Sequence, residues 1–205
     1  PKVLVSELSG KRNILYKASE LGVDLPPSGK EAQKLLEQVK LLESRGFQYD
    51  HAEASFELLV HRAKPDYQSP FELVDFMVLV EKRRRPPTRK GQGTLSEAMV
   101  KVRVGTEIMH TAAEGNGPVN ALDEALRKAL LQFYPSLAQV KLVDYKVRIL
   151  EESIGTGSQV RVLIESSDGV DEWRTVGSST NIIEASWLAL ADSLEYWLLK
   201  QNKST

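Results

Sequence analysis

The chain carries the same corner of structure twice, and this internal repeat limits the folds that it can adopt. Residues 110–130 align without a gap with residues 174–194, sixty-four positions later. The identical positions are Thr111 and Thr175, Ala121 and Ala185, Ala125-Leu126 and Ala189-Leu190, and Leu130 and Leu194. Each copy opens on the end of a strand pattern, passes through small residues and enters an amphipathic helix. Such a chain must build one strand–turn–helix unit two times.

The front of each half also repeats, which extends the unit to three strands and a helix. Leu73-Val74-Asp75-Phe76 recurs as Leu142-Val143-Asp144-Tyr145, and Val102-Arg103-Val104 recurs as Val160-Arg161-Val162. Strand patterns cover residues 71–82, 95–104, 106–113, 140–152, 158–166 and 171–177, and helices follow from about Pro118 and Asn181. The sequence therefore predicts an α+β fold, an internally duplicated βββα domain with antiparallel sheets and helices on one face.

The first 63 residues have helical patterns and predict a small subdomain ahead of the repeats. Helices are expected over residues 9–22, 28–46 and 50–63. The expected end signals are a cap glycine at Gly22 and at Gly46, and capping boxes at Ser28/Glu31 and Asp50/Glu53. We divide the chain into a helical linker subdomain, 1–65, and a duplicated domain, 66–205, with repeats at about 71–135 and 136–200.

Composition excludes several classes of protein. The chain has 205 residues, a formal net charge of −1 and no cysteine. The balanced charge does not favour nucleic acid or a membrane surface, and no apolar run is long enough to span a bilayer. The absence of cysteine excludes disulfides and fits a cytoplasmic, reducing environment. Because the chain begins at Pro1 and not at Met, we expect a fragment of a longer protein.

Other candidate constellations favour structural readings. The histidines His51, His61 and His110 lack metal-ligand spacing, so no metal site is expected. The basic run 83–90 is typical of a solvated loop. The pairs Asp123-Glu124 and Glu151-Glu152 are expected on the surface, and Trp173, Trp187 and Trp197 in the core or an interface. An independent hydrolase or isomerase would need a catalytic constellation, which these residues do not supply.

The repeated corner is the feature with a chemical use. Unpaired N–H groups and the positive end of the helix dipole gather at a helix N-terminus, which favours an anion such as a carboxylate. Gly115-Asn116-Gly117 allows close approach of a ligand to the backbone in the first copy. Ser178 to Asn181 offers hydroxyl and amide groups in the second, where Thr180 or Asn181 can act as N-cap. The alternative is that both corners are ordinary turns and caps.

Four segments together resemble a known family. They are residues 6–25, 45–62, 115–122 and 174–200, which include AEASFELL, GNGPVNAL and NIIEASW. They resemble the C-terminal half of the isopropylmalate synthase family and are most similar to its citramalate synthase branch. The resemblance covers nearly the whole chain.

The resemblance implies a regulatory fragment without catalysis of its own. In the family, an N-terminal (β/α)₈ barrel condenses acetyl-CoA with a 2-oxo acid and uses a divalent metal; that barrel is missing here, so no cofactor is expected in this chain. Residues 1–63 would be the linker, and residues from about 70 would form a homodimeric domain. This domain binds the branched-chain end product, leucine for isopropylmalate synthases and typically isoleucine for citramalate synthases. The alternative is a purely structural dimerisation module.

The resemblance also carries the effector-binding residues. The first corner supplies Gly115, Asn116, Gly117, Pro118, Val119 and Asn120. The strand supplies Leu142, Tyr145 and Ile149, and the second corner supplies Ser178, Thr180, Asn181 and Ile182. Leu142 and Ile149 differ by an odd number, so a regular strand would place them on opposite faces unless a bulge intervenes. Asp123 is a candidate acceptor for the α-amino group.

Overall fold

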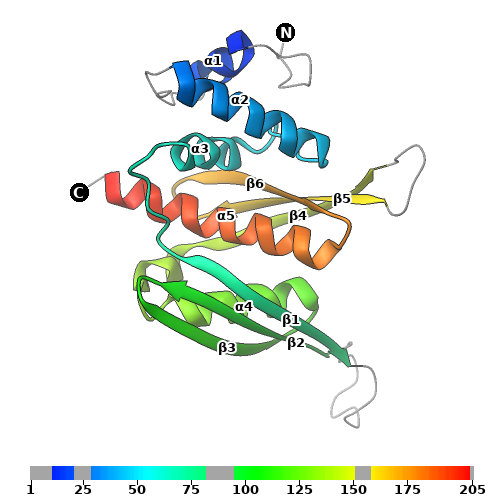
Figure 1. Cartoon of the computed structure of the whole chain (residues 1–205). Helices are drawn as coiled ribbons and strands as arrows, with labels where there is room; N and C mark the ends of the chain where they lie inside the picture. The colour runs from blue at the N-terminus through cyan, green and yellow to red at the C-terminus, as the bar shows by residue number, and fades with distance from the viewer. Residues whose placement is uncertain (1–10, 21–28, 82–94, 151–157, 204–205) are drawn as a thin grey trace. The chain divides into compact units, whose positions relative to one another are not determined.

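The computed structural model describes residues 11–20, 29–81, 95–150 and 158–203. The chain forms two compact units, residues 1–69 together with 141–205, and residues 70–140 (Figure 1). The second repeat therefore shares a unit with the helical segment, and the first repeat forms a unit of its own. The boundary that we placed between residues 65 and 66 stays a prediction. The expected features at Gly22, Ser28, 83–90 and Glu151-Glu152 lie outside the described residues.

The unit of residues 70–140 is the first βββα repeat. Its strands are β1 (Glu72–Glu81), β2 (Leu95–Val104) and β3 (Glu107–Gly115), which form an antiparallel sheet in the order β1-β2-β3. Helix α4 (Pro118–Leu130) covers one face, and the short 3₁₀ helix η1 (Pro135–Gln139) follows it. The interface is built from alternate residues of β2 and one stripe of α4, as the two periodicities require. These buried residues include Ala98, Val100, Val102, Ala121, Leu122, Ala125 and Leu126.

The second repeat has the same architecture. Its strands are β4 (Lys141–Leu150), β5 (Gln159–Ser167) and β6 (Glu172–Ser179), again antiparallel and in the order β4-β5-β6. Helix α5 (Ile182–Lys203) packs on the sheet (Figure 1). Trp173, Trp187 and Trp197 are buried, as expected. The duplicated α+β fold class is thus confirmed.

The strand ladders correct one part of the internal alignment. Phe76 pairs with Val100 and Val100 with Thr111, while Tyr145 pairs with Ile164 and Ile164 with Thr175. The middle strands are therefore also related by sixty-four positions, and matching Val102 with Val160, a shift of fifty-eight, was wrong. The two shifts differ by an even number, so both preserve the alternation of faces. A strand of alternating valines matches itself at either shift.

A bulge occurs at the same place in both repeats. The β1–β2 register shifts between Leu73 and Asp75, and the β4–β5 register shifts between Leu142 and Asp144. In each case the aspartate carboxylate accepts a hydrogen bond from the next backbone N–H, at 2.8 Å for Asp75 and 2.9 Å for Asp144. The extra residue moves Leu142 onto the face that holds Tyr145 and Ile149. The bulge thus resolves the odd spacing.

The helical segment consists of α1 (Lys11–Glu20), α2 (Gly29–Ser44) and α3 (Glu53–Arg62). Gly46 has φ of 92°, and its N–H and that of Phe47 bond back to Glu43 and Leu42, which is a Schellman motif and confirms this cap.

The capping box expected at Asp50 and Glu53 was wrong. The N-cap of α3 is Ala52, with no side-chain cap among the described residues. The Asp50 carboxylate is instead engaged by Lys17 at 3.2 Å and by Gln48 at 3.3 Å. The Asp50 carboxylate thus bonds to side chains outside α3, although its spacing from Glu53 predicted that it would cap this helix.

The face of the second sheet opposite α5 packs against these helices. Val176 and Leu163 join a core with Ile14, Leu35, Val39, Phe56 and Leu59. On edge strand β6, the N–H of Arg174 donates to the Glu53 carboxylate and that of Val176 to the Ser55 hydroxyl. The first turn of α3 thereby satisfies donors that a free sheet edge would expose to another chain.

Candidate functional site

The corner before α4 brings the backbone of strand and helix close together. A Cβ atom at Gly115 would lie 2.4 Å from the backbone nitrogen of Ala121, so only glycine fits there. The Asn120 side-chain oxygen accepts a hydrogen bond of 3.1 Å from the N–H of Asn116 and holds the turn closed. Gly117 is the N-cap in an extended conformation and Pro118 occupies the first turn, with no side-chain cap among the described residues. The N–H groups in the first turn of α4 therefore receive no hydrogen bond acceptor from the side chain of a capping residue.

The corner before α5 closes on itself. The Asn181 side-chain oxygen accepts hydrogen bonds from the N–H groups of Ile183 at 2.8 Å and Glu184 at 3.4 Å. The Ser179 hydroxyl donates to the Glu184 carboxylate at 2.6 Å and accepts from the N–H of Asn181 at 3.1 Å. Of the two N-cap candidates, Thr180 and Asn181, the structure selects Asn181. Its side-chain oxygen satisfies N–H groups of the second corner, whose counterparts in the first corner have no capping side chain.

Ser178 faces the helical segment rather than α5. Its hydroxyl donates to the carbonyl of Arg45 at 2.9 Å, and it is buried. The neighbouring Gly177 faces α5, since a Cβ atom there would lie 1.9 Å from the carbonyl oxygen of Ala185. Adjacent residues of a strand point to opposite faces. Ser178 is thus separated by the sheet from the face that carries Tyr145.

The α5-side face of β4 carries a row of apolar residues. It consists of Leu142, Tyr145, Val147 and Ile149, and Ile149 is 68% exposed. The Tyr145 hydroxyl lies 2.9 Å from the Ser186 hydroxyl of α5. Burial raises the pKa of Tyr145, and the hydrogen bond with Ser186 opposes this shift. The phenol is therefore protonated at neutral pH, and an apolar surface with one hydroxyl remains accessible along the strand.

The predicted effector residues fall into separate groups. Gly115 to Asn120 lie together in the unit of residues 70–140, while the β4 row and the second corner lie in the other unit. Asp123, the candidate ammonium acceptor, accepts from Arg127 Nε through both carboxylate oxygens, at 3.0 and 2.9 Å. Arg127 also donates to the carbonyls of Leu137 and Val140. Asp123 thus already has a cationic partner, which disfavours it as the acceptor.

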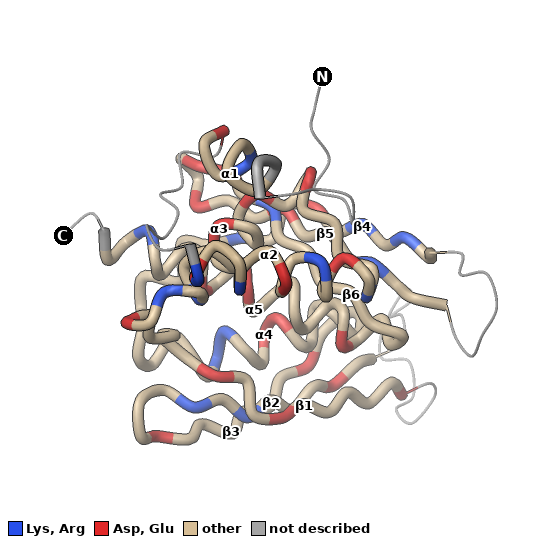
Figure 2. Tube along the Cα trace, turned by 45° about the horizontal axis from the view of Figure 1, so that its top comes forward, with Lys and Arg blue, Asp and Glu red and all other residues tan. Residues whose placement is uncertain are grey.

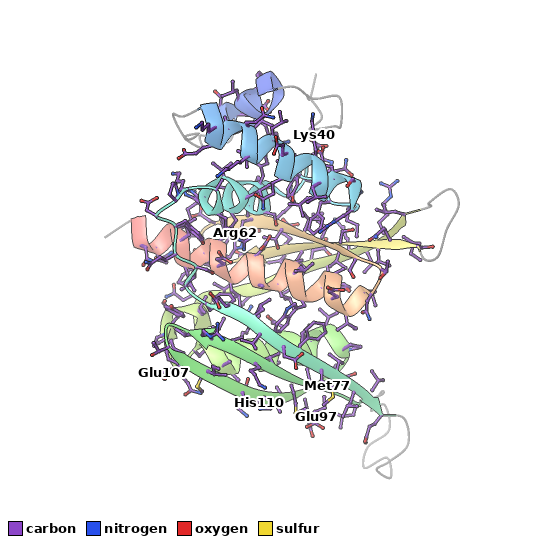
Figure 3. The ribbon with its side chains drawn as sticks, in the orientation of Figure 1. Lys40, Arg62, Met77, Glu97, Glu107 and His110 are labelled. Carbon is purple, nitrogen blue, oxygen red and sulfur yellow. The ribbon has the colours of Figure 1, made fainter. Side chains whose placement is uncertain are left out.

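An ionic cluster between α3 and α5 was not found by sequence reasoning. Arg62 Nη2 contacts Asp192 Oδ1 at 2.8 Å and Glu195 Oε2 at 2.5 Å; Figure 3 labels Arg62 on α3. Tyr67 donates to Glu195, and Ser55 donates to Asp192. Burial raises the pKa of Asp192, and the charge of Arg62 opposes the rise. The partners are more than 120 positions apart, so no local spacing could have signalled them.

Other site types find no support among the described residues. No group of three or more His, Cys, Asp or Glu in that part of the chain could hold a metal ion. None of the helices described is long and apolar enough to cross a membrane. Basic and acidic positions are interspersed along the described trace in both units (Figure 2).

Comparison with known proteins places these features in a family. Residues 50–198 match the model described as LeuA allosteric (dimerisation) domain. The (R)-citramalate synthase of Geobacter sulfurreducens is 52% identical over 98% of this chain, and that of Aquifex aeolicus is 47% identical over 98%. The 2-isopropylmalate synthase of Aquifex aeolicus is 26% identical over 98% of the chain. The chain spans 37% of the length of the first two relatives.

Proposed function

Since the chain belongs to the family of the LeuA allosteric (dimerisation) domain, we propose that it senses a branched-chain amino acid for feedback inhibition of a citramalate or 2-isopropylmalate synthase. The effector is isoleucine or leucine, and the domain forms a homodimer. The whole protein is a cytoplasmic acyltransferase that condenses acetyl-CoA with a 2-oxo acid. Its divalent metal and its substrates bind in a catalytic barrel outside this chain, which has no cofactor of its own.

The open N-terminus of α4 carries this proposal. The effector's carboxylate binds to the N–H groups of Val119 and Asn120, because the cap residue Gly117 offers no side-chain oxygen to them. Gly115 and Pro118 fix the path of the backbone, and Asn116 with Asn120 closes the turn. At the second corner, Asn181 fills the equivalent place with its own oxygen. The contrast supports the first corner as the carboxylate acceptor.

In the other unit, the β4 row is a surface that fits the apolar side chain of a branched-chain amino acid. Leu142, Tyr145 and Ile149 share a face because of the bulge, and Ile149 is exposed. A branched aliphatic side chain gains about 25 cal/mol for each Å² of apolar surface removed from water. Thr180, Asn181 and Ile182 are proposed effector contacts in the same unit as the β4 row. Ser178 lies on β6, where its hydroxyl donates to the carbonyl of Arg45 on the other face of the sheet.

A thermal melt of the full-length protein tests the proposal. Isoleucine, leucine and valine are added separately and compared with no ligand. A ligand at one hundred times its dissociation constant should stabilise the folded state by about 2.7 kcal/mol, a shift of several degrees. A shift with isoleucine alone favours a citramalate synthase, and a shift with leucine alone favours a 2-isopropylmalate synthase.

Gly117→Asn transfers the cap of the second corner to the first and is the sharpest variant. Its side chain should satisfy the N–H groups of α4, raise stability by a few tenths of a kcal/mol and weaken effector binding about tenfold or more. Gly117→Ala is the matched control, because a Cβ at this position meets nothing within 4 Å and adds no acceptor. Calorimetric titration gives both affinities. Equal affinities of the two variants would exclude the α4 N-terminus as the carboxylate site.

The second candidate function is a purely structural dimerisation module. It is favoured by the second corner, whose donors are already satisfied within the fold. No shift with any of the three amino acids, in a protein that is still a dimer by sedimentation, would establish this alternative.

A further inference from the structure

Two arginines lie directly opposite each other on the outer face of the second sheet. The β4–β5 ladder pairs Arg148 with Arg161, three residues beyond the pair of Tyr145 with Ile164. Because successive residues of a strand point to opposite faces, this odd spacing puts the arginines on the face away from α5. It is the face on which Leu163 packs against the helical segment. The sheet therefore separates the arginine pair from the β4 row.

Arg161 is held in a fixed orientation by acceptors that carry no charge. Its Nε donates to the carbonyl of Gly46 at 2.7 Å, and its Nη1 donates to the side-chain oxygen of Gln48 at 2.7 Å. Among the described residues, Nη2 has no hydrogen bond partner. A carbonyl and an amide orient the guanidinium but do not neutralise it. Arg161 therefore keeps a full positive charge and unused N–H donors.

Arg148 adds a second positive charge that no described residue compensates. It is exposed, and its side chain forms no hydrogen bond or ion pair within the described part of the chain. Lys146, on the same face two residues earlier, is by contrast paired with Asp144 at 2.9 Å. Burial lowers the pKa of Arg161, and the charge of Arg148 lowers it further. The two cations thus repel each other, which is destabilising for like charges directly opposite in a sheet.

The first repeat shows that the fold does not need this pair. The positions equivalent to Arg148 and Arg161 are Leu79 and Glu97, which the β1–β2 ladder also pairs directly. An apolar residue and an acid therefore occupy the same place in a sheet of the same register. A like-charged pair that lowers stability and is not required by the fold is typical of a binding site.

We infer that Arg148 and Arg161 bind a phosphate group on the outer face of the second sheet. The planar fork of a guanidinium donates parallel hydrogen bonds to a phosphate. A phosphate monoester carries a charge of about −1.5 to −2 at neutral pH, which matches two arginines, whereas a carboxylate would neutralise only one. A free phosphate ion and a phosphate carried by a larger molecule share this chemistry.

Calorimetric titration of the full-length protein tests the inference. The probes are inorganic phosphate and glycerol 3-phosphate, each at an ionic strength held constant with chloride. Arg148→Leu introduces the residue of the first repeat and should weaken binding about 10- to 100-fold, the loss of charge-assisted hydrogen bonds. Lys146→Leu is the matched control, because it removes the same charge from the same face of β4. At physiological ionic strength it should weaken binding about twofold or less.

Thermal melts separate a binding role of Arg148 from a structural one. Without phosphate, Arg148→Leu should raise the melting temperature, because it removes the like charge opposite Arg161. Saturating phosphate should raise the melting temperature of the unmodified protein and leave that of Arg148→Leu nearly unchanged. A structural role would instead give a lower melting temperature for the variant and the same phosphate response in both proteins.

The two probes also identify the source of the phosphate. Binding of glycerol 3-phosphate that is lost in Arg148→Leu supports a phosphate carried by a larger molecule, and binding of inorganic phosphate alone supports the free ion. The inference is overturned if neither probe binds, or if Arg148→Leu and Lys146→Leu weaken binding equally. None of these measurements uses isoleucine or leucine, so the inference and the proposed function can fail separately.

Discussion

The two repeats of this chain share the contacts that tie the last strand to the helix, and they differ at the helix N-terminus, in one strand–helix pair and on the outer face of the sheet. Thr111 donates to the carbonyl of Ala125 at 2.7 Å, and Thr175 donates to that of Ala189 at 2.8 Å. Each bond ties the last strand of its repeat to the following helix across fourteen residues. The aspartate-stabilised bulge is repeated as well. These shared contacts define what the βββα unit needs to fold.

The differences lie at the helix N-terminus and beside the first strand. Gly117 of the first repeat aligns with Asn181 of the second. Phe76 and Leu122 of the first repeat correspond to Tyr145 and Ser186 of the second. Among the described residues, the first corner has no side-chain cap whereas Asn181 caps the second, and the first pair is apolar whereas the second is a hydrogen-bonded pair of hydroxyls. The duplication thus acts as an internal control, because a feature present in only one repeat is not demanded by the fold.

The outer faces of the sheets also differ. The second sheet packs on the α1–α3 helices through Leu163 and Val176. On the first sheet, Met77, Leu79 and Ile108 stay exposed, and Figure 3 shows Met77 and His110 on this unit. Among the described residues, the helical segment is held by side chains of the second repeat, Asp192 and Glu195 included. The second repeat and the helical segment are therefore joined within one unit.

Arg62→Met should break the ionic cluster between α3 and α5 and cause the largest loss of stability among these variants. It leaves Asp192 and Glu195, whose side chains are 16% and 6% exposed, without their shared cation. We expect a loss of about 3 kcal/mol in the free energy of unfolding, measured by urea denaturation. Arg103→Met on the first repeat is the control: its pair with Glu72 is exposed at both ends and should contribute less than about 0.5 kcal/mol. Equal losses would show that the α3–α5 cluster contributes no more stability than an exposed ion pair.

The same variant has a defined pH dependence. Burial raises the pKa of Asp192 above its unfolded value, with Arg62 opposing, so the folded state binds this proton more tightly. A raised carboxyl pKa gives stability that is present at low pH and lost as pH rises through the folded value. Removing Arg62 raises the pKa of Asp192 further. The stability lost by Arg62→Met should therefore be larger at pH 7 than at pH 5.

Gly177→Ala should have the next largest effect and sharpen the comparison of helix packing. A Cβ at Gly177 would lie 1.9 Å from the carbonyl oxygen of Ala185, so α5 would have to move away from β6. The expected loss is about 3 kcal/mol or less, an overpacking cost, in urea denaturation. The equivalent residue of the first repeat is Ala113, which already carries a Cβ beneath α4. Gly117→Ala is the control, because it introduces the same atom into open space.

An unchanged stability for Gly177→Ala would mean that α5 can shift from β6 without cost. The two helices would then pack on their sheets with equal tolerance. The difference between Ala113 and Gly177 would carry no structural meaning.

Much of the fold could be predicted from the sequence because its signals are local. Alternation of apolar residues located the six strands that the structure describes, and the gap-free match of residues 110–130 with 174–194 located the starts of α4 and α5. Gly46 was recognised as a cap because a left-handed backbone after a helix favours glycine. The match of Val102 with Val160 was wrong, because an alternating pattern repeats every two residues and fits equally well at alignment shifts that differ by an even number.

The site was only partly predictable, because its decisive contacts join distant residues. Asn181 could be proposed as a cap from its place before the helix. The contact of Tyr145 with Ser186 spans 41 positions, and that of Ser178 with Arg45 spans 133. Neither has a spacing rule. Asp123 was proposed as an ammonium acceptor before its pairing with Arg127 was visible, although their i,i+4 spacing on a helix was a signal that could have been used.

The smallest expected effects come from the contact that both repeats share. Thr111→Val and Thr175→Val each remove one buried hydroxyl bond to a helix carbonyl while keeping the side-chain shape. Each should lower the free energy of unfolding by about 1 kcal/mol, because the carbonyls of Ala125 and Ala189 retain their helical acceptor role. The two residues lie in different units, so the double variant should lose the sum of the single losses in urea denaturation. Unequal losses would mean that the same bond has come to matter differently in the two repeats. The hydroxyl would then be needed for stability in one repeat and not in the other. Neither repeat could then serve as a full control for its partner.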